Sequence, residues 1–525
     1  MKLSSSTLRT FTTLHTWVGI VAGFALFVAF YAGAITVFHH DLMLWQAPHA
    51  MDKPVETMDD AQRLLDETLR RHPDSRKWIG LLFPGGESPQ ALTYWPDAQG
   101  TWHYASLDNP DGGTQPPQAA LSELINELHY SLGIPVAGVY LMGIVSMLYG
   151  VALISGLIIH LPKLAGDLFA LRPGRNLKRF WQDAHNVIGV LGLPLHLMFA
   201  ITGAMLCLVM VAAFALNPLI YGGKLMEAMP AALDTAPVRE PAQVAASMGA
   251  LSGWVERSQQ VAREQGLAEF EPAYLKLTHA GDRNATVEIT GEVPRMLGAL
   301  GAVALDAGSG RVLATQLPGN RDANHATLSI AYLLHFGEYG NAWVQWLYFL
   351  LGVGGAFLFY SGNLLWIESR RKRRQHEQGR SPLWMARATV GVCIGLCVAV
   401  SASFVAAQAM ESDWLAGKDV AAGIRWTCFS TWASCALWAA LRAPVRAARE
   451  LLWAAALATA LIPIAHGAVS GWWWWKSAAA GHWALFAIDA GALAMAVGFA
   501  MLARATARRA HHGEPNSVWA DPRGA

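Results

Sequence analysis

Eight long apolar runs constrain this chain more than any other feature of its sequence. The runs cover residues 17–38, 136–160, 186–212, 342–367, 386–408, 424–441, 451–470 and 481–503. About 20 apolar residues in a helix cross the hydrocarbon core of a bilayer, so runs of this length predict transmembrane helices. Hydrophobic residues make up 53% of the chain and charged residues only 15%. This composition is typical of a polytopic membrane protein and not of a soluble enzyme.

The charges between the runs predict the orientation of the chain. Basic residues precede the first run and follow the second, fourth, sixth and eighth runs. By the positive-inside rule, both termini are cytoplasmic and the two long polar segments face outward. The first run is too long for a signal-peptide core, so we interpret it as a retained helix. The net charge of +1 says nothing about a nucleic-acid partner, and no basic patch interleaved with aromatic residues argues for one, so none is expected.

The two polar segments each predict a small α+β domain. The first combines an amphipathic pattern over residues 59–72 with two short strand patterns, 78–84 and 90–96. The second has a helix pattern within 242–266, followed by strand patterns at 273–280, 284–290 and 301–316. Within the last of these, the DAGSG tract predicts a tight turn between two strands.

The predicted fold class is mainly α: a membrane bundle of about eight helices with two small α+β periplasmic domains. The predicted boundaries are 10–40 (first transmembrane helix), 41–128 (first periplasmic domain), 129–162 (second helix), 163–184 (cytoplasmic loop), 185–212 (third helix), 213–334 (second periplasmic domain), 335–368 (fourth helix), 369–385 (basic cytoplasmic loop), 386–503 (four additional helices) and 504–525 (cytoplasmic tail).

Two histidines mark residues 182–206 as a candidate functional helix. His185 and His196 are eleven residues apart. In one continuous helix they would lie within roughly 20° of the same face and about 16 Å apart along the axis. Imidazole is costly in hydrocarbon, so a histidine there marks a functional site by default. Haem ligation and a hydrogen bond to a neighbouring helix both explain such a residue.

A repeat within the first four runs favours haem ligation. Each run carries a small residue followed by glycine, and each of these pairs is preceded by a histidine. The spacings are His15 to Gly33 and His185 to Gly203, 18 residues each, and His129 to Gly156 and His335 to Gly362, 27 residues each. Residues 10–165 and 180–370 therefore resemble tandem copies of one unit, each made of a helix, an outward domain and a helix.

The repeat predicts two pairs of histidines at matched depths in the membrane. Both copies begin on the inside, so His15 lies opposite His185 near the cytoplasmic surface and His129 opposite His335 near the outer surface. An iron porphyrin needs two axial nitrogens at one depth, and this arrangement supplies them twice. Because 27 helical residues span about 40 Å, more than the hydrocarbon core, we expect His129 and His335 to lie on short helices before the main spans.

Other residues carry weaker signals. The repeat counterpart of His196 is Leu26, so His196 either replaces a ligand of the outer pair or serves as a proton or electron relay. His160, His39 and His40 are expected at the membrane interfaces. Cys393 and Cys397 share a helix face without a nearby histidine or acid, as small apolar fillers do. No glycine-rich G-x-G-x-x-G fingerprint supports a nicotinamide or flavin site.

Four stretches carry a resemblance to a known family. They are LHTWVGIVAGFALFVAFYAGAITVFHHDL, ELHYSLGI, DAHNVIGVLGLPLHLMFAITG and LLHFGEYGN with FYSGNLLWIESRRKR. They resemble the PepSY-associated transmembrane family over residues 10–375, and the segment ending VALDAGSGRVLATQ looks like a PepSY module. The four helices of 386–503 and the extra His196 depart from the family pattern.

The resemblance implies a four-helix core with two b-type haems in an oxidoreductase of the inner membrane. It implies that the protein reduces ferric siderophores and releases iron in the periplasm, with His15, His129, His185 and His335 as iron ligands. Bis-imidazole haem carries electrons and leaves no position for oxygen. The donor is either a quinol or a cytoplasmic reductase. Two alternatives remain: a permease subunit for siderophore or metal, and a membrane-anchored PepSY regulatory or binding protein without redox activity.

Overall fold

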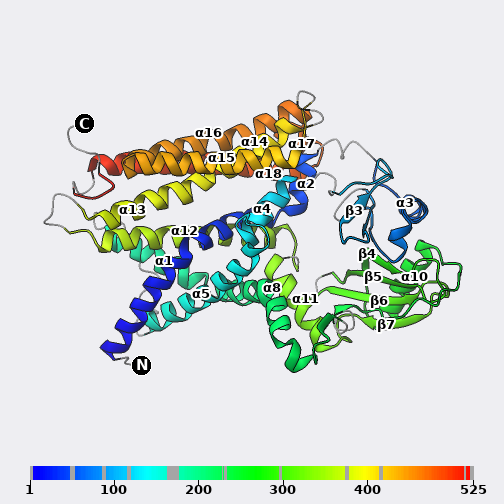
Figure 1. Cartoon of the computed structure of the whole chain (residues 1–525). Helices are drawn as coiled ribbons and strands as arrows, with labels where there is room; N and C mark the ends of the chain where they lie inside the picture. The colour runs from blue at the N-terminus through cyan, green and yellow to red at the C-terminus, as the bar shows by residue number, and fades with distance from the viewer. Residues whose placement is uncertain are drawn as a thin grey trace. The chain divides into compact units, whose positions relative to one another are not determined.

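The computed structural model contains two compact units (Figure 1). It describes residues 4–47, 54–85, 90–114, 120–161, 177–226, 229, 233–294, 298–337, 339–372, 378–412, 415, 418–512 and 516–520. The membrane unit comprises Met1–Pro48, Ala119–Val209 and Trp346–Ala525, and the sheet unit comprises His49–Gln118 and Met210–Gln345. Most of the predicted cytoplasmic loop 163–184 lies outside the described residues.

Helices form the whole described part of the membrane unit. Their bounds are α1 Ser5–Thr36, α2 His39–Gln46, α4 Ala120–Ser131, α5 Ala137–His160, α7 Leu177–Leu191, α8 Leu193–Ile220, α12 Ala342–Ser369, α13 Arg380–Thr389, α14 Gly395–Met410, α15 Val420–Leu441, α16 Pro444–Ser470, α17 Trp474–Ala479 and α18 Trp483–His512. A π-helical turn, Val390–Ile394, joins α13 to α14. Both α8 and α12 continue from one unit into the other.

Among the described residues, seven helices, where we expected about eight, are long and apolar enough to cross a membrane. The expected run at 424–441 does form a helix, α15. Its Arg425 and its several serine, threonine and tryptophan residues make α15 less apolar than the other seven. The four C-terminal runs are helical, and α13 and α14 form one continuous span with the π-helical turn.

Helix breaks fall where the sequence predicted them, with one exception. The α4–α5 connection contains Gly133 at a φ of 70°. The α11 helix (Ala323–Phe336) ends at Gly337 with a φ of 75° before α12 begins. These left-handed residues place His129 and His335 on separate short helices, as expected. The stretch 182–206, expected as one helix, is instead interrupted at Gly192, so His185 lies on α7 and His196 on α8.

The sheet unit contains one antiparallel sheet, in the order β3-β2-β1-β4-β5-β6-β7. The strands are β1 Trp78–Leu82, β2 Leu92–Pro96, β3 Trp102–Ala105, β4 Glu271–Thr278, β5 Thr286–Glu292, β6 Leu300–Asp306 and β7 Val312–Gln316. Strand β1 pairs with β4, from Trp78 opposite Thr278 to Leu82 opposite Tyr274. The prediction of two separate small domains was therefore wrong, because the two polar segments share one sheet.

Two amphipathic helices supply the core of the sheet unit. They are α3 (Met58–Arg71), which begins with a capping box between Thr57 and Asp60, and α10 (Leu251–Glu264). Leucines of α3 and Trp254 of α10 join the buried strand residues in a single apolar cluster. One core thus spans both polar segments of the sequence, which explains why neither forms a domain alone.

Candidate functional site

The structure brings His15 and His185 together inside the membrane unit. His15 lies on α1 and His185 on α7, with ring centroids 6.1 Å apart and ring planes at 82°. An imidazole nitrogen binds a first-row metal at about 2 Å and lies about 1 Å from its ring centre, so two imidazoles on opposite sides of one metal have centroids about 6 Å apart. The observed separation matches that of a pair of axial ligands.

Each histidine of the pair donates one ring proton to a main-chain carbonyl. The Nδ1 atom of His15 lies 2.9 Å from the oxygen of Ala152 on α5. The Nδ1 atom of His185 lies 3.0 Å from the oxygen of Leu358 on α12. A carbonyl only accepts, so Nδ1 carries the proton and Nε2 keeps its lone pair for a metal. Ligating histidines are usually oriented in this way.

The predicted small-residue–glycine pairs make room for these imidazoles. A Cβ atom on Gly156 would lie 3.1 Å from the His15 ring, and one on Gly362 would lie 3.3 Å from the His185 ring. The carbonyl that accepts the proton lies four residues before the glycine in both cases. Each of these glycines faces a histidine of a neighbouring helix.

A cavity of about 520 Å³ opens around this pair, and its lining fits a haem. Residues of α1, α5, α7 and α12 surround it, including both histidines and Gly189. The side chain of Asn363 also lines the cavity, is buried, and its amide nitrogen has no hydrogen-bond partner in the described structure. A buried donor without a partner is uncommon and points to a ligand that accepts a hydrogen bond.

Cationic side chains line the same cavity. Lys178 and Arg370 are both among its lining residues, together with His160. The guanidinium of Arg370 lies 3.8 Å from the centre of the Trp366 ring, which fixes its position. Haem carries two carboxylates, and Lys178 and Arg370 are suited to pair with them.

The second predicted pair divides between the two units. His129 lies on α4, and its Nδ1 donates to the oxygen of Ala29 at 2.7 Å. A Cβ atom on Gly33, four residues after Ala29, would lie 2.6 Å from that ring. His129 therefore uses the same carbonyl-and-glycine arrangement as His15 and His185. His335 lies on α11 in the sheet unit, so the pairing of His129 with His335 stays a prediction.

His196 is buried among aromatic rings on α8. Its ring centroid lies 5.8 Å from that of Phe30 and 6.1 Å from that of Tyr149. It is 1% exposed, and neither ring nitrogen has a hydrogen-bond partner among the described residues. Because Tyr149 also lines the cavity, His196 lies beyond the wall of the inner site. This position agrees with either predicted role, relay or ligand.

One buried polar pair was not predicted from the sequence. His466 on α16 and Asp489 on α18 are fully buried, and His466 Nδ1 lies 2.8 Å from a carboxylate oxygen of Asp489. The signal was a histidine in one apolar run and the only acidic residue of another, at 451–470 and 481–503. Nothing in the spacing of the two residues indicated that the runs are neighbours.

Comparison with known proteins identifies the family. The profile of the PepSY-associated TM region matches residues 12–369. The chain belongs to this family. A similar curated protein is Uncharacterized protein PA4219 of Pseudomonas aeruginosa, which is 28% identical over 314 residues. That alignment covers 57% of this chain and 75% of the relative. The family match ends before α13, so the C-terminal helices lie outside it.

Proposed function

We propose that the protein is an inner-membrane electron-transfer protein with two b-type haems that reduces ferric siderophores on the periplasmic side. The observation that carries this proposal is the His15–His185 pair. Its rings have the separation of two axial ligands, their Nδ1 protons are held by carbonyls, and a large cavity surrounds them.

Main-chain carbonyls of the protein hold the two histidine rings in the orientation that a haem would need. The carbonyls of Ala152 and Leu358 fix the ring orientation of His15 and His185. Neutral imidazoles suit this apolar site, because a charged one would be costly there. When bound, a haem with two imidazole ligands supplies one-electron transfer. A ferric siderophore holds ferric iron far better than ferrous iron, so reduction by one electron loosens the metal.

The outer histidine and the sheet unit extend the proposal to the periplasm. The His129 ring is held in the same way as the rings of the inner pair. Its Nδ1 donates a hydrogen bond to the carbonyl of Ala29, and the absence of a side chain at Gly33 leaves space for the ring. Under the predicted orientation, the sheet unit is periplasmic, where the ferric chelate arrives. The rings of Phe359, which lines the inner cavity, and Phe30 form a chain of contacts from that cavity to His196.

Haem content tests the proposal directly. Purified protein should show the reduced-minus-oxidised spectrum of low-spin b haem with two haems per chain. His15→Ala and His185→Ala should each leave about one haem. A colourless protein after haem-supplemented expression would contradict the proposal, as would loss of both haems or of neither in the variants.

Reduction of the chelate is measured separately. Protein reduced with dithionite and then freed of it should be reoxidised by a ferric siderophore, with ferrous iron trapped by a ferrous-specific chelator. The control is the same siderophore loaded with Ga³⁺, which cannot accept an electron. Equal reoxidation by both would show that another oxidant is responsible.

A further inference from the structure

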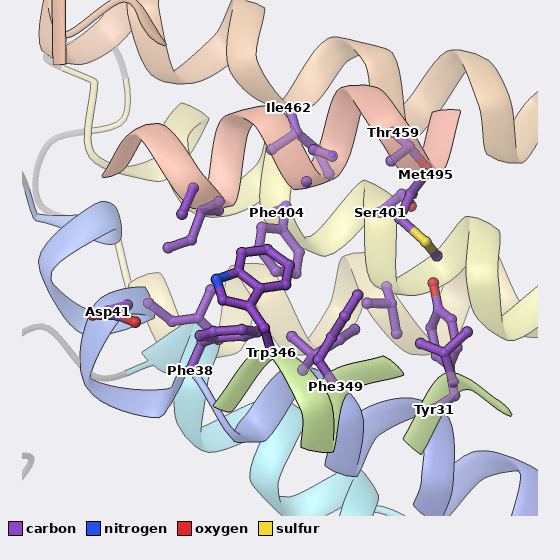
Figure 2. Close-up of a pocket in the computed structure, with 18 residues that line it drawn as sticks. Tyr31, Phe38, Asp41, Trp346, Phe349, Ser401, Phe404, Thr459, Ile462 and Met495 are labelled. Carbon is purple, nitrogen blue, oxygen red and sulfur yellow. Dashed lines mark hydrogen bonds between the residues drawn. The ribbon is translucent and has the colours of Figure 1, made fainter. Parts of the chain in front are cut away.

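A second cavity lies between the family core and the C-terminal helices. It has a volume of about 100 Å³ and is lined by residues of α1, α2, α12, α14, α16 and α18. Phe38, Trp346, Phe349 and Phe404 make its walls aromatic, and Figure 2 shows the Asp41 carboxylate near one end and the Tyr31 hydroxyl near the other. This volume corresponds to several water molecules, on the scale of one substituted aromatic ring.

The buried His466–Asp489 pair lies on α16 and α18, two of the helices whose residues line this cavity. Ile462, which lines the cavity, lies one helical turn before His466, and Ile488, also in the lining, directly precedes Asp489. The Trp45 ring packs against His466 at 4.9 Å, and its Nε1 donates to Asp489 at 2.9 Å. The pair is thus part of a buried polar network beside an aromatic cavity in the membrane.

The network contains polar atoms that nothing in the described structure satisfies. The Nε2 atom of His466 and the side-chain oxygen of Gln408 have no hydrogen-bond partner there, although both residues are fully buried. Gln408 donates to the carbonyl of Trp45 at 2.9 Å, so both unpartnered atoms belong to residues that contact Trp45. Burying an unpaired polar atom destabilises the fold, so a structural role alone does not explain this arrangement.

We propose that this cavity binds the head group of a membrane quinol, and that Asp41 and the His466–Asp489 pair accept its two protons. A quinol is a flat apolar ring with two hydroxyls, which matches aromatic walls with polar groups nearby. A soluble donor would need a charged water-facing site, whereas this cavity lies among transmembrane helices. This inference rests on the proposed function, because the electrons need an acceptor in the same chain.

The chemistry balances without another reactant. Oxidation of the quinol to the quinone breaks two O–H bonds and releases two protons and two electrons. The protons pass to Asp41, which is half-buried at the end of the bundle, and to His466, whose Nδ1 proton is held by Asp489. From this end of the bundle they reach the periplasm. The electrons leave one at a time, one for each of the two predicted haems.

The cavity is close to the outer haem-ligand candidate. Tyr31 lines the cavity, and Ala29, two residues earlier on α1, accepts the His129 proton. Tyr31 and Ala29 lie on different faces of the same turn of α1. The cavity and His129 are therefore separated by about one helix diameter, or about 10 Å. The C-terminal helices also hold α4 itself, because Arg425 on α15 pairs with Glu127, two residues before His129.

Two glycines of α18 offer a matched pair of variants for a binding test. A Cβ on Gly491 would contact the Trp346 ring at 3.7 Å, whereas one on Gly498 would meet nothing within 4 Å. Binding of oxidised decyl-ubiquinone to the purified full-length protein is measured by equilibrium dialysis, with or without haem. Gly491→Leu should weaken binding at least tenfold, and Gly498→Leu should not change it. No saturable binding to the unaltered protein, or equal binding to both variants, overturns the assignment of the cavity.

The proton acceptors are tested by reduction kinetics. His466→Gln and Asp41→Asn should still bind the quinone, but decyl-ubiquinol should reduce their haems at least tenfold more slowly. Dithionite should reduce the haems of every variant at the same rate. Unchanged quinol rates in both variants overturn the proton-accepting role. If dithionite produces no haem spectrum in the unaltered protein, the proposed function is overturned instead. The equilibrium-dialysis result then decides by itself whether the cavity binds quinone.

Discussion

The membrane unit holds histidines in two contrasting environments. At the inner site, the Nδ1 atoms of His15 and His185 each donate a hydrogen bond to a neutral carbonyl, and both residues line a large cavity. In the C-terminal helices, the Nδ1 atom of His466 hydrogen-bonds to the carboxylate of Asp489, and both groups are fully buried. A carbonyl leaves the imidazole neutral, as a metal ligand must be, while a carboxylate stabilises the imidazolium and so favours a proton acceptor.

The contrast shows that the partner of Nδ1, and not burial, decides what a buried histidine is suited for. His15 and His466 lie on helices long and apolar enough to cross a membrane, whereas His185 lies on the shorter helix α7, which also carries charged residues. The carbonyl partners are associated with glycines that face the ring, whereas the carboxylate partner has an indole donor, Trp45, on its other oxygen.

Filling the space beside His185 should remove the inner haem. In Gly362→Leu the side chain occupies the position where a Cβ already lies 3.3 Å from the ring, so His185 has to move. Gly354→Leu is the control on the same helix, because a Cβ there meets nothing within 4 Å. We expect about one haem per chain in the first variant and two in the second, measured by pyridine haemochrome. Full haem content in Gly362→Leu would show that the glycine does not serve the imidazole.

Removing the carboxylate should destabilise the membrane unit. Asp489→Ala leaves the ring nitrogen of His466 and the indole nitrogen of Trp45 without their buried acceptor, which costs about 1–3 kcal/mol for each unsatisfied group. Asp489→Asn should cost less, because its amide oxygen still accepts a hydrogen bond. The unfolding midpoint of the full chain in detergent distinguishes the two. If Asp489→Ala unfolds at the same point as the unaltered protein, the pair contributes nothing to stability and the contrast with the inner site fails.

The sequence predicted the parts that depend on local patterns. The apolar runs, the breaks before α5 and α12, and the helix and strand patterns of the polar segments all appear in the structure. The spacing repeat singled out His15 and His185, which the structure brings within 6.1 Å. Periodicity and spacing report on residues close in the chain, so they locate elements and matched positions well.

The missed features all depend on pairing between distant segments. Strand β1 pairs with β4, about two hundred residues later, and neither segment signals that it needs the other to complete a sheet. The repeat in the sequence pairs His15 with Gly33 and His129 with Gly156. In the structure the contacts are exchanged, because the His15 ring lies against Gly156 and the His129 ring lies against Gly33. The contact between His466 and Asp489 was missed for the same reason, because the residue pattern of one helix does not indicate which other helix packs against it.

An ion pair in the water-facing sheet unit should show a smaller, pH-dependent effect. Burial raises the pKa of Asp306, but the Ser309 main chain and Arg239 outweigh it and lower the pKa to about 2. This carboxylate stabilises the fold above its unfolded pKa near 3.8, and the contribution is lost as the pH falls from about 4 to about 2. At about 1.4 kcal/mol per pKa unit, the contribution is about 2 kcal/mol.

Asp306→Asn isolates this contribution. Its unfolding free energy should be lower than that of the unaltered protein at pH 6, and the difference should shrink at pH 2.5, as followed by near-UV circular dichroism of the full chain. Arg239→Gln is the matched variant, since Arg239 lies 3.0 Å from the carboxylate. A constant difference across this pH range would show that ionisation of Asp306 does not contribute to the free energy of unfolding.

The smallest effect is expected from the hydroxyls beside the inner histidines. Ser361 Oγ lies 3.4 Å from His185 Nδ1, too far for a strong hydrogen bond, and itself donates to the carbonyl of Leu358 at 2.8 Å. Ser361→Ala therefore leaves the carbonyl partner of His185 in place and should lower haem affinity by less than about tenfold. Ser155→Ala, beside His15, should behave alike, because its hydroxyl is also 3.4 Å from that ring. Haem titration of the apoprotein measures both, and complete loss of haem in either would move the orienting role from the carbonyl to the serine.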